Sequence, residues 1–313
     1  MAATFLGSAR LLQARSALAL LGSAMQVRLC HAQRTGRARS LIRFLNPSGD
    51  VCFGEPLSRQ KGKAQLVKDP NDASLELSPA VADVAELLAP VPCTPPAVWC
   101  VGLNYKKHAE EVQHDLPAFP VLTMKSATAL LSPLKNIVIP SVASKTPEVD
   151  IEAELCIVIG RKGSNIRKED AMKHILGFTV ANDVSARRWQ GKKMSGQWVR
   201  AKSFDTFLPV GPTLVTPEAL EKAGLDIQNL QIRSFVNGEM LQNASTKDMI
   251  FSPADLVSFI SQDTTLLPGT LILTGTPQGV GYARDPPIFL KPGDVVCVSI
   301  EHIGDLINPV VAA

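Results

Sequence analysis

The chain has 313 residues, of which 45% are hydrophobic, 19% charged and 5% aromatic, and its formal net charge is +3 at pH 7. This length fits one large domain or two unequal ones, and the composition excludes fibrous and disordered classes of protein. Because no block of Lys and Arg is interleaved with aromatic side chains, we expect no nucleic-acid partner.

The N-terminal segment is basic, with seven Arg and no Asp or Glu in residues 1–43, although the rest of the chain is slightly acidic. Residues 11–21 can form a helix with one apolar and one basic side, which is typical of an organellar transit peptide. We therefore predict a transit peptide over residues 1–40 and a location in the mitochondrial matrix; a disordered basic tail is the alternative. Arg10 and Arg15 interrupt the apolar run, which disfavours a secretory signal. A membrane span is not expected either, because the sequence contains no apolar stretch of about 18 residues.

The segment that follows, residues 41–91, predicts a small N-terminal subdomain and linker. A helix is expected to begin at Ser78-Pro79 and to end near Leu88. Four Pro residues between positions 90 and 96 then form a stretch that cannot be the interior of a helix. The catalytic domain is predicted over residues 92–313.

The pattern after the linker indicates an α+β protein that is mainly β. Strands are expected at residues 98–101, 154–159, 177–180, 230–236, 271–274 and 295–300. Helices are expected at residues 105–113, 168–175 and 252–261, the last with Ser252 as N-cap and Asp255 completing a capping box. Regular alternation of strands and helices is missing, which disfavours a doubly wound parallel sheet. The six Cys show no metal-binding spacing and are expected to be reduced thiols.

Paired carboxylates are the sharpest local feature. Glu152 and Glu154 stand two positions apart at the start of a strand, so their side chains project from one face. Two adjacent negative charges need a neutralising partner, and an oxygen-seeking cation such as Mg²⁺ suits them. Asp183, after another apolar run, offers a third carboxylate. Taken singly, the Glu pair also fits a solvated strand face, and Asp183 also fits a helix N-cap.

His108 and Glu111 stand three residues apart on a predicted helix, which places an imidazole and a carboxylate on one side. Such a pair can activate water or move a proton near neutral pH. An exposed helix with an incidental His, between Lys and Glu neighbours, is the alternative reading.

A glycine-rich loop at residues 275–281 follows a predicted strand and could bring backbone amides and the Thr276 hydroxyl close to an anion. Its spacing matches no nucleotide-binding loop, and a plain tight turn is the alternative. Lys125 and Lys202 are candidate counter-charges for a substrate carboxylate, although most Lys side chains are simply solvated.

Taken in order, these motifs closely resemble the fumarylacetoacetate hydrolase family over roughly residues 97–311. The motifs that carry the resemblance are Cys100-Val101-Gly102-Leu103-Asn104-Tyr105 with His108 and Glu111, Val149-Asp150-Ile151-Glu152-Ala153-Glu154-Leu155, Asn182-Asp183-Val184-Ser185-Ala186-Arg187, Lys202-Ser203-Phe204-Asp205-Thr206, Val236-Asn237-Gly238-Glu239 and Leu273-Thr274-Gly275-Thr276-Pro277.

The resemblance implies a distorted mixed β-roll as the catalytic domain, in homodimers. It implies that Glu152, Glu154 and Asp183 hold Mg²⁺, with Mn²⁺ as an alternative ion. It further implies that His108 and Glu111 form an acid-base pair on a segment that closes over the site. The substrate pocket is implied to be lined by Arg187, Gln190, Lys202 and Thr276.

Two departures from the family pattern bear on substrate choice: Arg188 stands where Asp is usual, and Thr123-Met124-Lys125 lacks the usual Phe two residues before Lys. The activity implied is stabilisation of the enolate of a 2-oxo acid, and keto-enol tautomerisation of oxaloacetate is favoured. Acylpyruvate hydrolysis at a C–C bond and oxaloacetate decarboxylation are the alternatives, and a catalytically silent binding protein is a reading from another class.

Overall fold

The computed structural model describes residues 39–69, 74–143 and 148–313. The predicted transit peptide therefore lies outside the described residues, apart from its last two positions. Within these ranges, no helix combines the length and the apolar character that crossing a membrane requires.

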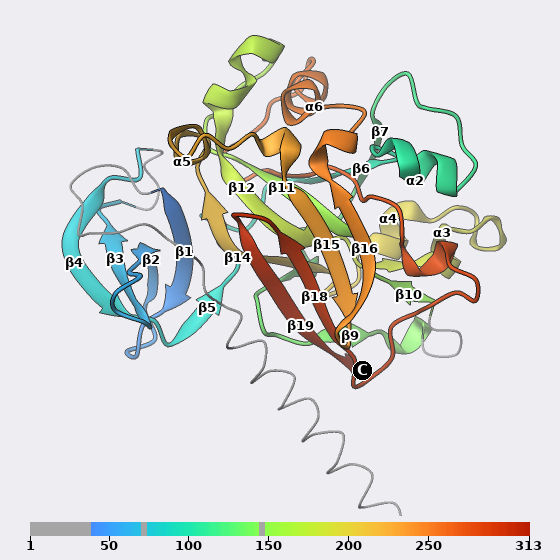
Figure 1. The fold of residues 1–313 in the computed structure, drawn as a ribbon, viewed down its shortest axis with the longest axis horizontal. Helices are drawn as coiled ribbons and strands as arrows, with labels where there is room; N and C mark the ends of the chain where they lie inside the picture. Colours follow the sequence, from blue (N-terminus) through green and yellow to red (C-terminus); the bar gives the residue numbers. More distant parts are fainter. Residues whose placement is uncertain (1–38, 70–73, 144–147) are drawn as a thin grey trace, which may run out of the picture.

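Strands dominate the described residues, as the sequence predicts, and the fold is of the expected mainly β, α+β class (Figure 1). The strands are β1 (Ser40–Leu45), β2 (Val51–Pro56), β3 (Lys63–Val67), β4 (Leu77–Asp83), β5 (Glu86–Leu88), β6 (Val98–Gly102), β7 (Val121–Met124), β8 (Leu130–Leu131), β9 (Ile137–Ile139), β10 (Val149–Asp150), β11 (Ala153–Ile159), β12 (Ile175–Asn182), β13 (Ser185–Ala186), β14 (Leu208–Val215), β15 (Gln231–Val236), β16 (Glu239–Ser245), β17 (Leu271–Leu273), β18 (Val295–Ile300) and β19 (Gly304–Ala312). The α-helices are α2 (Lys106–Glu111), α3 (Arg187–Gln190), α4 (Trp198–Lys202), α5 (Pro217–Lys222) and α6 (Pro253–Ile260), and the 3₁₀ helices are η1 (Ala127–Ala129), η2 (Ser141–Ala143), η3 (Lys168–His174), η4 (Lys192–Met194), η5 (Ile227–Asn229), η6 (Thr246–Asp248) and η7 (Gly281–Ala283).

The largest sheet has β14, β12 and β11 side by side at its centre, and every residue of these three strands is buried. Their sequences are nearly continuous apolar runs because both faces of the sheet are covered. Pairing among them is antiparallel, whereas β17 pairs with β6 in parallel, so the sheet is mixed. The strand order is β4-β3-β2-β1-β14-β12-β11-β17-β6-β7, with β5 on β1 and β8 on β14.

A second sheet, with the order β16-β15-β18-β19-β9, lies in front of these strands in the view of Figure 1. Its first hairpin, β15–β16, turns at Asn237-Gly238, and both residues have positive φ angles, of 53° and 84°. A two-residue turn with both central residues at positive φ matches the twist of an antiparallel pair, which is why Asn-Gly marks such hairpins.

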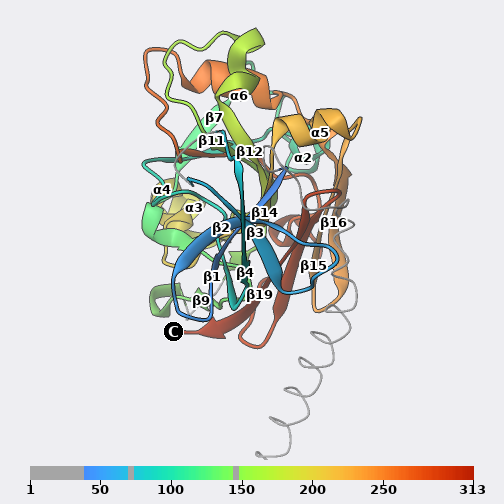
Figure 2. The ribbon, with the colours of Figure 1, turned by 90° about the vertical axis from the view of Figure 1, so that its left-hand side faces the viewer.

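The N-terminal strands β1 to β5 form a group at one side of the molecule, seen face-on in Figure 2. Strand β1 joins this group to the main sheet, because its first two residues pair with β14 and its last four pair with β2. A small core of Ile42, Phe44 and Ala64 lies inside the group. Since β1 belongs to both parts, the predicted boundary between residues 91 and 92 stays a prediction.

The helix predicted from Ser78-Pro79 to Leu88 is wrong: the segment forms strands β4 and β5. Strand β4 pairs with β3 at the edge of the sheet, and β5 pairs with β1. Pro79 lacks a backbone N–H and is tolerated in a strand at an edge. The turn residues Ser-Pro indicate a helix start locally, but pairing with neighbouring strands overrides them.

The other predicted helices are found, with small changes. Helix α2 lies within residues 105–113, and α6 has the predicted capping box between Ser252 and Asp255. The segment at 168–175 is the 3₁₀ helix η3, which ends where β12 begins.

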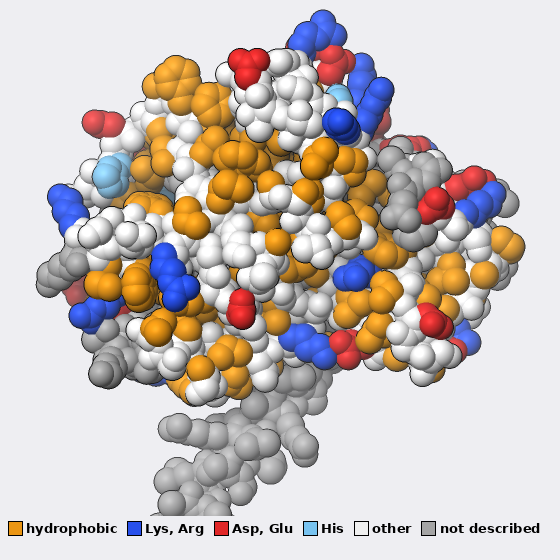
Figure 3. Space-filling view, turned by 180° about the vertical axis from the view of Figure 1, so that it is seen from behind, with side chains coloured by type: hydrophobic (Ala, Val, Ile, Leu, Met, Phe, Trp, Pro, Cys, Tyr) orange, Lys and Arg blue, Asp and Glu red, His pale blue; other side chains and the backbone are white. Residues whose placement is uncertain are grey.

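On the reverse face, hydrophobic side chains occupy much of the upper half, while charged side chains are found mainly near the periphery (Figure 3).

Candidate metal centre and active site

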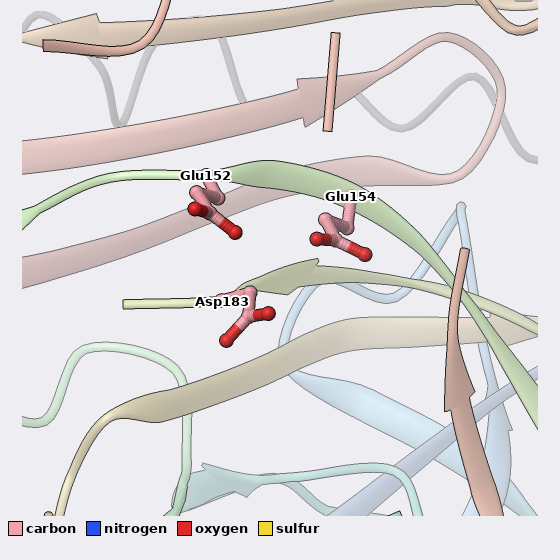
Figure 4. A group of neighbouring side chains, drawn as sticks. All are labelled: Glu152, Glu154 and Asp183. Carbon is pink, nitrogen blue, oxygen red and sulfur yellow. The ribbon is translucent and has the colours of Figure 1, made fainter. Parts of the chain in front are cut away.

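Three carboxylate side chains meet where β11 begins and β12 ends (Figure 4). Glu154 belongs to β11, Glu152 stands two residues before it, and Asp183 follows the last residue of β12. The Asp183 amide donates a hydrogen bond of 2.9 Å to the Glu152 carbonyl, which fixes the two chains together. All three residues are buried, and one oxygen from each lies within 4.8 Å of the others.

Two buried Lys side chains contact these carboxylates. The Lys202 Nζ lies 2.9 Å from Glu152 Oε2, 2.6 Å from Asp183 Oδ2 and 2.9 Å from Ser185 Oγ. The Lys125 Nζ lies 2.6 Å from Asp183 Oδ1 and also donates to the carbonyl oxygens of Val184 and Lys202. Each ammonium therefore has three partners within the protein, and both Lys side chains hold Asp183 in place.

Glu152 and Glu154 differ in their electrostatic surroundings. Burial alone would raise the pKa of Glu152, but the Lys202 and Arg187 cations hold it at about 2. The pKa of Glu154 is raised well above its usual range by burial and by the charges of Asp183 and Glu152. Its carboxylate accepts a 2.6 Å hydrogen bond from the Gly275 amide.

The donor set fits a divalent cation. The charged side chains grouped at the site are the buried acids Asp150, Glu152, Glu154 and Asp183, the buried bases Lys125 and Lys202, and the partly buried Arg187. Four carboxylates face three cations, and Glu154 is the member with no basic partner at ion-pair distance among the described residues. A hard cation with oxygen ligands would supply the missing positive charge, as carboxylate sites for Mg²⁺ and Mn²⁺ require.

Asp150 is a residue that the sequence analysis did not select. Its carboxylate accepts from the amides of Gly281 and Tyr282, at 2.8 and 3.0 Å, and from the Arg187 Nε at 2.8 Å. Arg187 in turn contacts Glu152 through a terminal nitrogen at 2.5 Å. Asp150 thus fixes both the guanidinium and the loop beside it. The signal was present, because Asp150 continues the alternating spacing of the two Glu residues.

Close packing of this loop depends on glycine. A Cβ placed on Gly281 would lie 1.9 Å from the Ile288 carbonyl oxygen and 2.6 Å from the Asp150 Oδ1. Only glycine lets the backbone approach so closely, so this part of the glycine-rich segment is shaped by contact with the buried carboxylate.

His108 and Glu111 pair as their spacing predicts. The His108 Nδ1 lies 2.9 Å from Glu111 Oε2, and the other Glu111 oxygen accepts from the Gly279 amide at 2.8 Å. Helix α2 is thereby joined to the glycine-rich loop, which holds the imidazole in a fixed orientation. His108 lies close enough to Glu152 for its charge to lower the pKa of that carboxyl, after the larger effects of Lys202 and Arg187.

Thr276 is held by a side chain from the second sheet. The Gln242 Nε2 donates to Thr276 Oγ1 at 2.7 Å and to the Pro277 carbonyl at 2.8 Å, while Gln242 Oε1 accepts from the Ala153 amide at 2.9 Å. Gln242 therefore connects β16, the loop and the start of β11. The Thr276 hydroxyl proton stays available to an anion. No local signal in the sequence marks Gln242, since its contacts with Ala153, Thr276 and Pro277 join residues that are distant along the chain.

Gln190, at the end of α3, accepts a 3.2 Å hydrogen bond from an Arg187 terminal nitrogen. Within the described ranges, its buried Nε2 has no hydrogen-bond partner. A buried amide donor without a partner is costly, and a bound ligand can satisfy it.

Together, the mixed β fold and the buried carboxylates define a class of mainly β proteins with a candidate site for a divalent cation. Comparisons with known proteins place the chain within that class. Residues 97–311 match the family model described as fumarylacetoacetate (FAA) hydrolase C-terminal. The chain therefore belongs to the fumarylacetoacetate hydrolase family.

Two curated relatives share this family and a function in their names. The mitochondrial oxaloacetate tautomerase fahd2 of Xenopus laevis is 48% identical over 225 residues, which cover 72% of this chain and 68% of that protein. The mitochondrial oxaloacetate tautomerase FAHD2A of Homo sapiens is 43% identical over 252 residues, which cover 80% and 78%.

Solved structures agree with the fold. A 5-carboxymethyl-2-hydroxymuconate delta-isomerase from Mycobacterium smegmatis superposes with a TM-score of 0.75 at 36% identity, over 88% of this chain and 100% of that one. A fumarylacetoacetate hydrolase from psychrophilic Exiguobacterium antarcticum has the same TM-score at 33% identity and the same coverage. The fold therefore carries both isomerases and hydrolases, and it does not separate these reactions by itself.

Proposed function

We propose that this protein is an oxaloacetate keto-enol tautomerase that uses a divalent cation. The observation that carries the proposal is the group of three buried carboxylates beside His108, in a chain similar to two named oxaloacetate tautomerases. A cation bound by Glu152, Glu154 and Asp183 would act as a Lewis acid that stabilises the enolate of a 2-oxo acid. Mg²⁺ is the proposed ion, with Mn²⁺ as the alternative.

His108 is the proposed acid-base residue. With its Nδ1–H donated to Glu111, the Nε2 is the ring nitrogen that exchanges a proton with substrate. Conversion of enol to ketone removes the proton of the 2-hydroxyl group and adds a proton at C3, so no net proton is gained or lost. Glu111 orients the imidazole through its hydrogen bond with Nδ1.

Other side chains are proposed to hold the substrate and its charge. Burial opposes the charge of Lys202, but Asp183 and Glu152 raise its pKa, so it stays an ammonium beside the developing enolate. Arg187, the free Gln190 amide and the Thr276 hydroxyl offer donors to substrate carboxylates. The contacts of Lys125 favour a role in positioning Asp183 over direct binding of substrate.

The decisive experiment follows absorbance of enol-oxaloacetate after mixing with purified protein, with Mg²⁺ or with chelator, while pyruvate release is measured in parallel. Fast ketonisation that depends on the metal and releases no pyruvate supports the tautomerase. Pyruvate release indicates the decarboxylase instead. If neither signal exceeds the uncatalysed rate, acylpyruvates are the next substrates, and cleavage of these at a C–C bond would replace the proposal with a hydrolase.

Location and assembly are also proposals. The two relatives carry "mitochondrial" in their names, and with the basic N-terminal segment this supports import into mitochondria, where we propose the matrix as the destination. We further propose a homodimer. Fractionation with protease protection tests the first, and sedimentation velocity tests the second, where a monomer at micromolar concentration would contradict it.

A further inference from the structure

The segment from Arg187 to Lys202 has an unusual charge content. It holds six Lys and Arg residues and no Asp or Glu in 16 positions. The segment begins four residues after Asp183 and ends at Lys202. Both of its ends lie at the carboxylate group, because the Arg187 and Lys202 side chains both contact Glu152. The stretch between these two anchors is held near the site, because α3 contacts η4 and α4, and α4 contacts β13, which begins two residues after Asp183.

Three cations of this stretch have a large part of their surface exposed to solvent. Arg188, Lys192 and Arg200 are exposed, and we call them the cationic collar. Arg187 and His108 have 13% and 12% of their side-chain surface exposed to solvent, against 5% for Lys202. The collar lies beside this more exposed part of the site, since Arg188 follows Arg187 directly.

The Arg200 guanidinium is held in place by aromatic rings. It lies 4.3 Å from the ring centre of Phe204 and 5.7 Å from that of Trp189, and these two rings contact each other edge to face at 6.3 Å. Cation–π contacts restrict a side chain that would otherwise move freely in solvent. The positive charge is thereby fixed beside the site.

Charge balance indicates which ligands the collar suits. With all four carboxylates ionised, this group of charged side chains has one net negative charge, and a bound divalent cation would change it to one net positive charge. A singly charged ligand would neutralise the site by itself. A doubly charged ligand leaves one negative charge over, and nearby exposed cations can compensate it.

We propose that the cationic collar attracts doubly charged 2-oxo acids to the site and favours them over singly charged ones. The inference rests on the proposed function and extends it, because it assigns the preference for a dicarboxylate to Arg188, Lys192 and Arg200. Clusters of one sign of charge raise the local concentration of an oppositely charged ligand by about 10- to 1,000-fold. The effect is screened by salt, since the Debye length falls from about 10 Å at 0.1 M to about 3 Å at 1 M.

Variants at two collar positions separate charge from packing. Lys192→Gln and Arg200→Gln each remove one charge, while Arg200→Lys keeps the charge and changes the contact with Phe204. Lys63→Gln and Lys222→Gln are matched controls, because these exposed Lys belong to β3 and α5, on the other side of the molecule from α3 and α4 (Figure 1).

Binding is measured by calorimetry on the full Mg²⁺-loaded chain with malonate and with its monomethyl ester, which differ by one charge. We expect wild type to prefer malonate at low salt. Each collar charge removed should lower this preference by about 3- to 10-fold, high salt should abolish the difference, and Arg200→Lys and the controls should match wild type. Equal binding of both ligands by wild type, or an unchanged preference in both Gln variants of the collar, would overturn the proposal.

Turnover of enol-oxaloacetate by the same proteins separates this inference from the proposed function. The collar predicts a loss in kcat/KM with kcat within about twofold of wild type, because steering acts before chemistry. The protein could show a collar-dependent preference for malonate and yet have no tautomerase activity. That result would support the role of the collar and contradict the proposed function.

Discussion

The individual side chains of the site are arranged so that opposite charges hold one another in place. Asp183 forms ion pairs with two ammonium groups, and Glu152 forms ion pairs with Lys202 and Arg187. Arg187 also donates a hydrogen bond to Asp150. Buried ion pairs contribute little net stability because each charge loses its hydration. Their value in this site is geometric: they fix ligand oxygens and donors before a substrate arrives.

At His108, replacement by Gln removes the group that moves the proton while keeping a polar side chain of similar length. We expect turnover of enol-oxaloacetate to fall by about 10²- to 10⁴-fold, with Mg²⁺ affinity unchanged. Stopped-flow absorbance measures the first and calorimetric titration the second. His302→Gln, at an exposed His in the turn between β18 and β19, is the control. A His108 variant as active as wild type would contradict the acid-base role.

At Glu154, replacement by Gln removes the carboxylate that lacks a cationic partner. We expect Mg²⁺ affinity to fall by at least about tenfold, because a neutral amide is a poorer ligand for a hard cation. Without metal, the variant should be as stable as wild type or more so, since the buried charge is gone. Calorimetric titration and chelator-treated thermal melts test both points, and unchanged Mg²⁺ affinity would place the metal elsewhere.

At the scale of elements, short segments bring the site together from distant parts of the chain. Helix α2 carries His108 and Glu111 and is tied to the loop after β17, while the three carboxylates lie at the start of β11 and just after β12. The Asn104 side chain, just before α2, donates to the carbonyls of Thr274 and Phe251 and accepts from the Phe251 amide. These bonds lock the entry to α2 onto the end of β17.

Helix α6 supports a pH prediction. Burial opposes the charge of Asp255, but hydrogen bonds from Lys168 and Ser252 lower its pKa below the usual value. A lowered pKa in the folded state contributes stability above the ordinary carboxyl pKa, and this contribution is lost as pH falls through the folded value. Asp255→Asn should therefore lower the urea midpoint at pH 7, and the difference from wild type should shrink toward pH 3.

The N-cap of α6 and an exposed acid nearby provide the comparisons. Ser252→Ala should cost about 1 kcal/mol at pH 7, because it leaves the Asp255 amide without its side-chain acceptor. Asp263→Asn, at an exposed site just beyond the helix, should leave the midpoint unchanged. An Asp255 variant with the same deficit at every pH would show that its effect is not electrostatic.

At the scale of the whole molecule, the site joins two sheets and several loops, so a bound metal should stabilise the complete fold. The Gln242 side chain links the second sheet to the start of β11, and Asp150 links β10 to the loop at residues 281–282. A cation that binds the folded chain alone adds about 2.7 kcal/mol at 100 times its dissociation constant.

Thermal melts should therefore shift upward with Mg²⁺ and return with chelator. The shift should vanish in a Glu152→Ala/Glu154→Ala variant and persist in His108→Gln, which keeps every proposed ligand. An equal shift in the carboxylate variant would show that Mg²⁺ stabilises the protein through some other site.

The sequence by itself determined the class of fold, six of the strands, the capped helix α6 and the grouping of Glu152, Glu154 and Asp183. These features depend on local periodicity, on capping residues and on motifs in a fixed order, all of which a linear chain displays. Tertiary structure decided the rest. It turned the segment at 78–88 into strands, because pairing with β3 and β1 outweighs a local helix signal. It also brought Gln242 into contact with the site and gave the Lys125 ammonium all its partners within the protein. Partners 30 or more residues away along the chain decide the role of such buried polar groups.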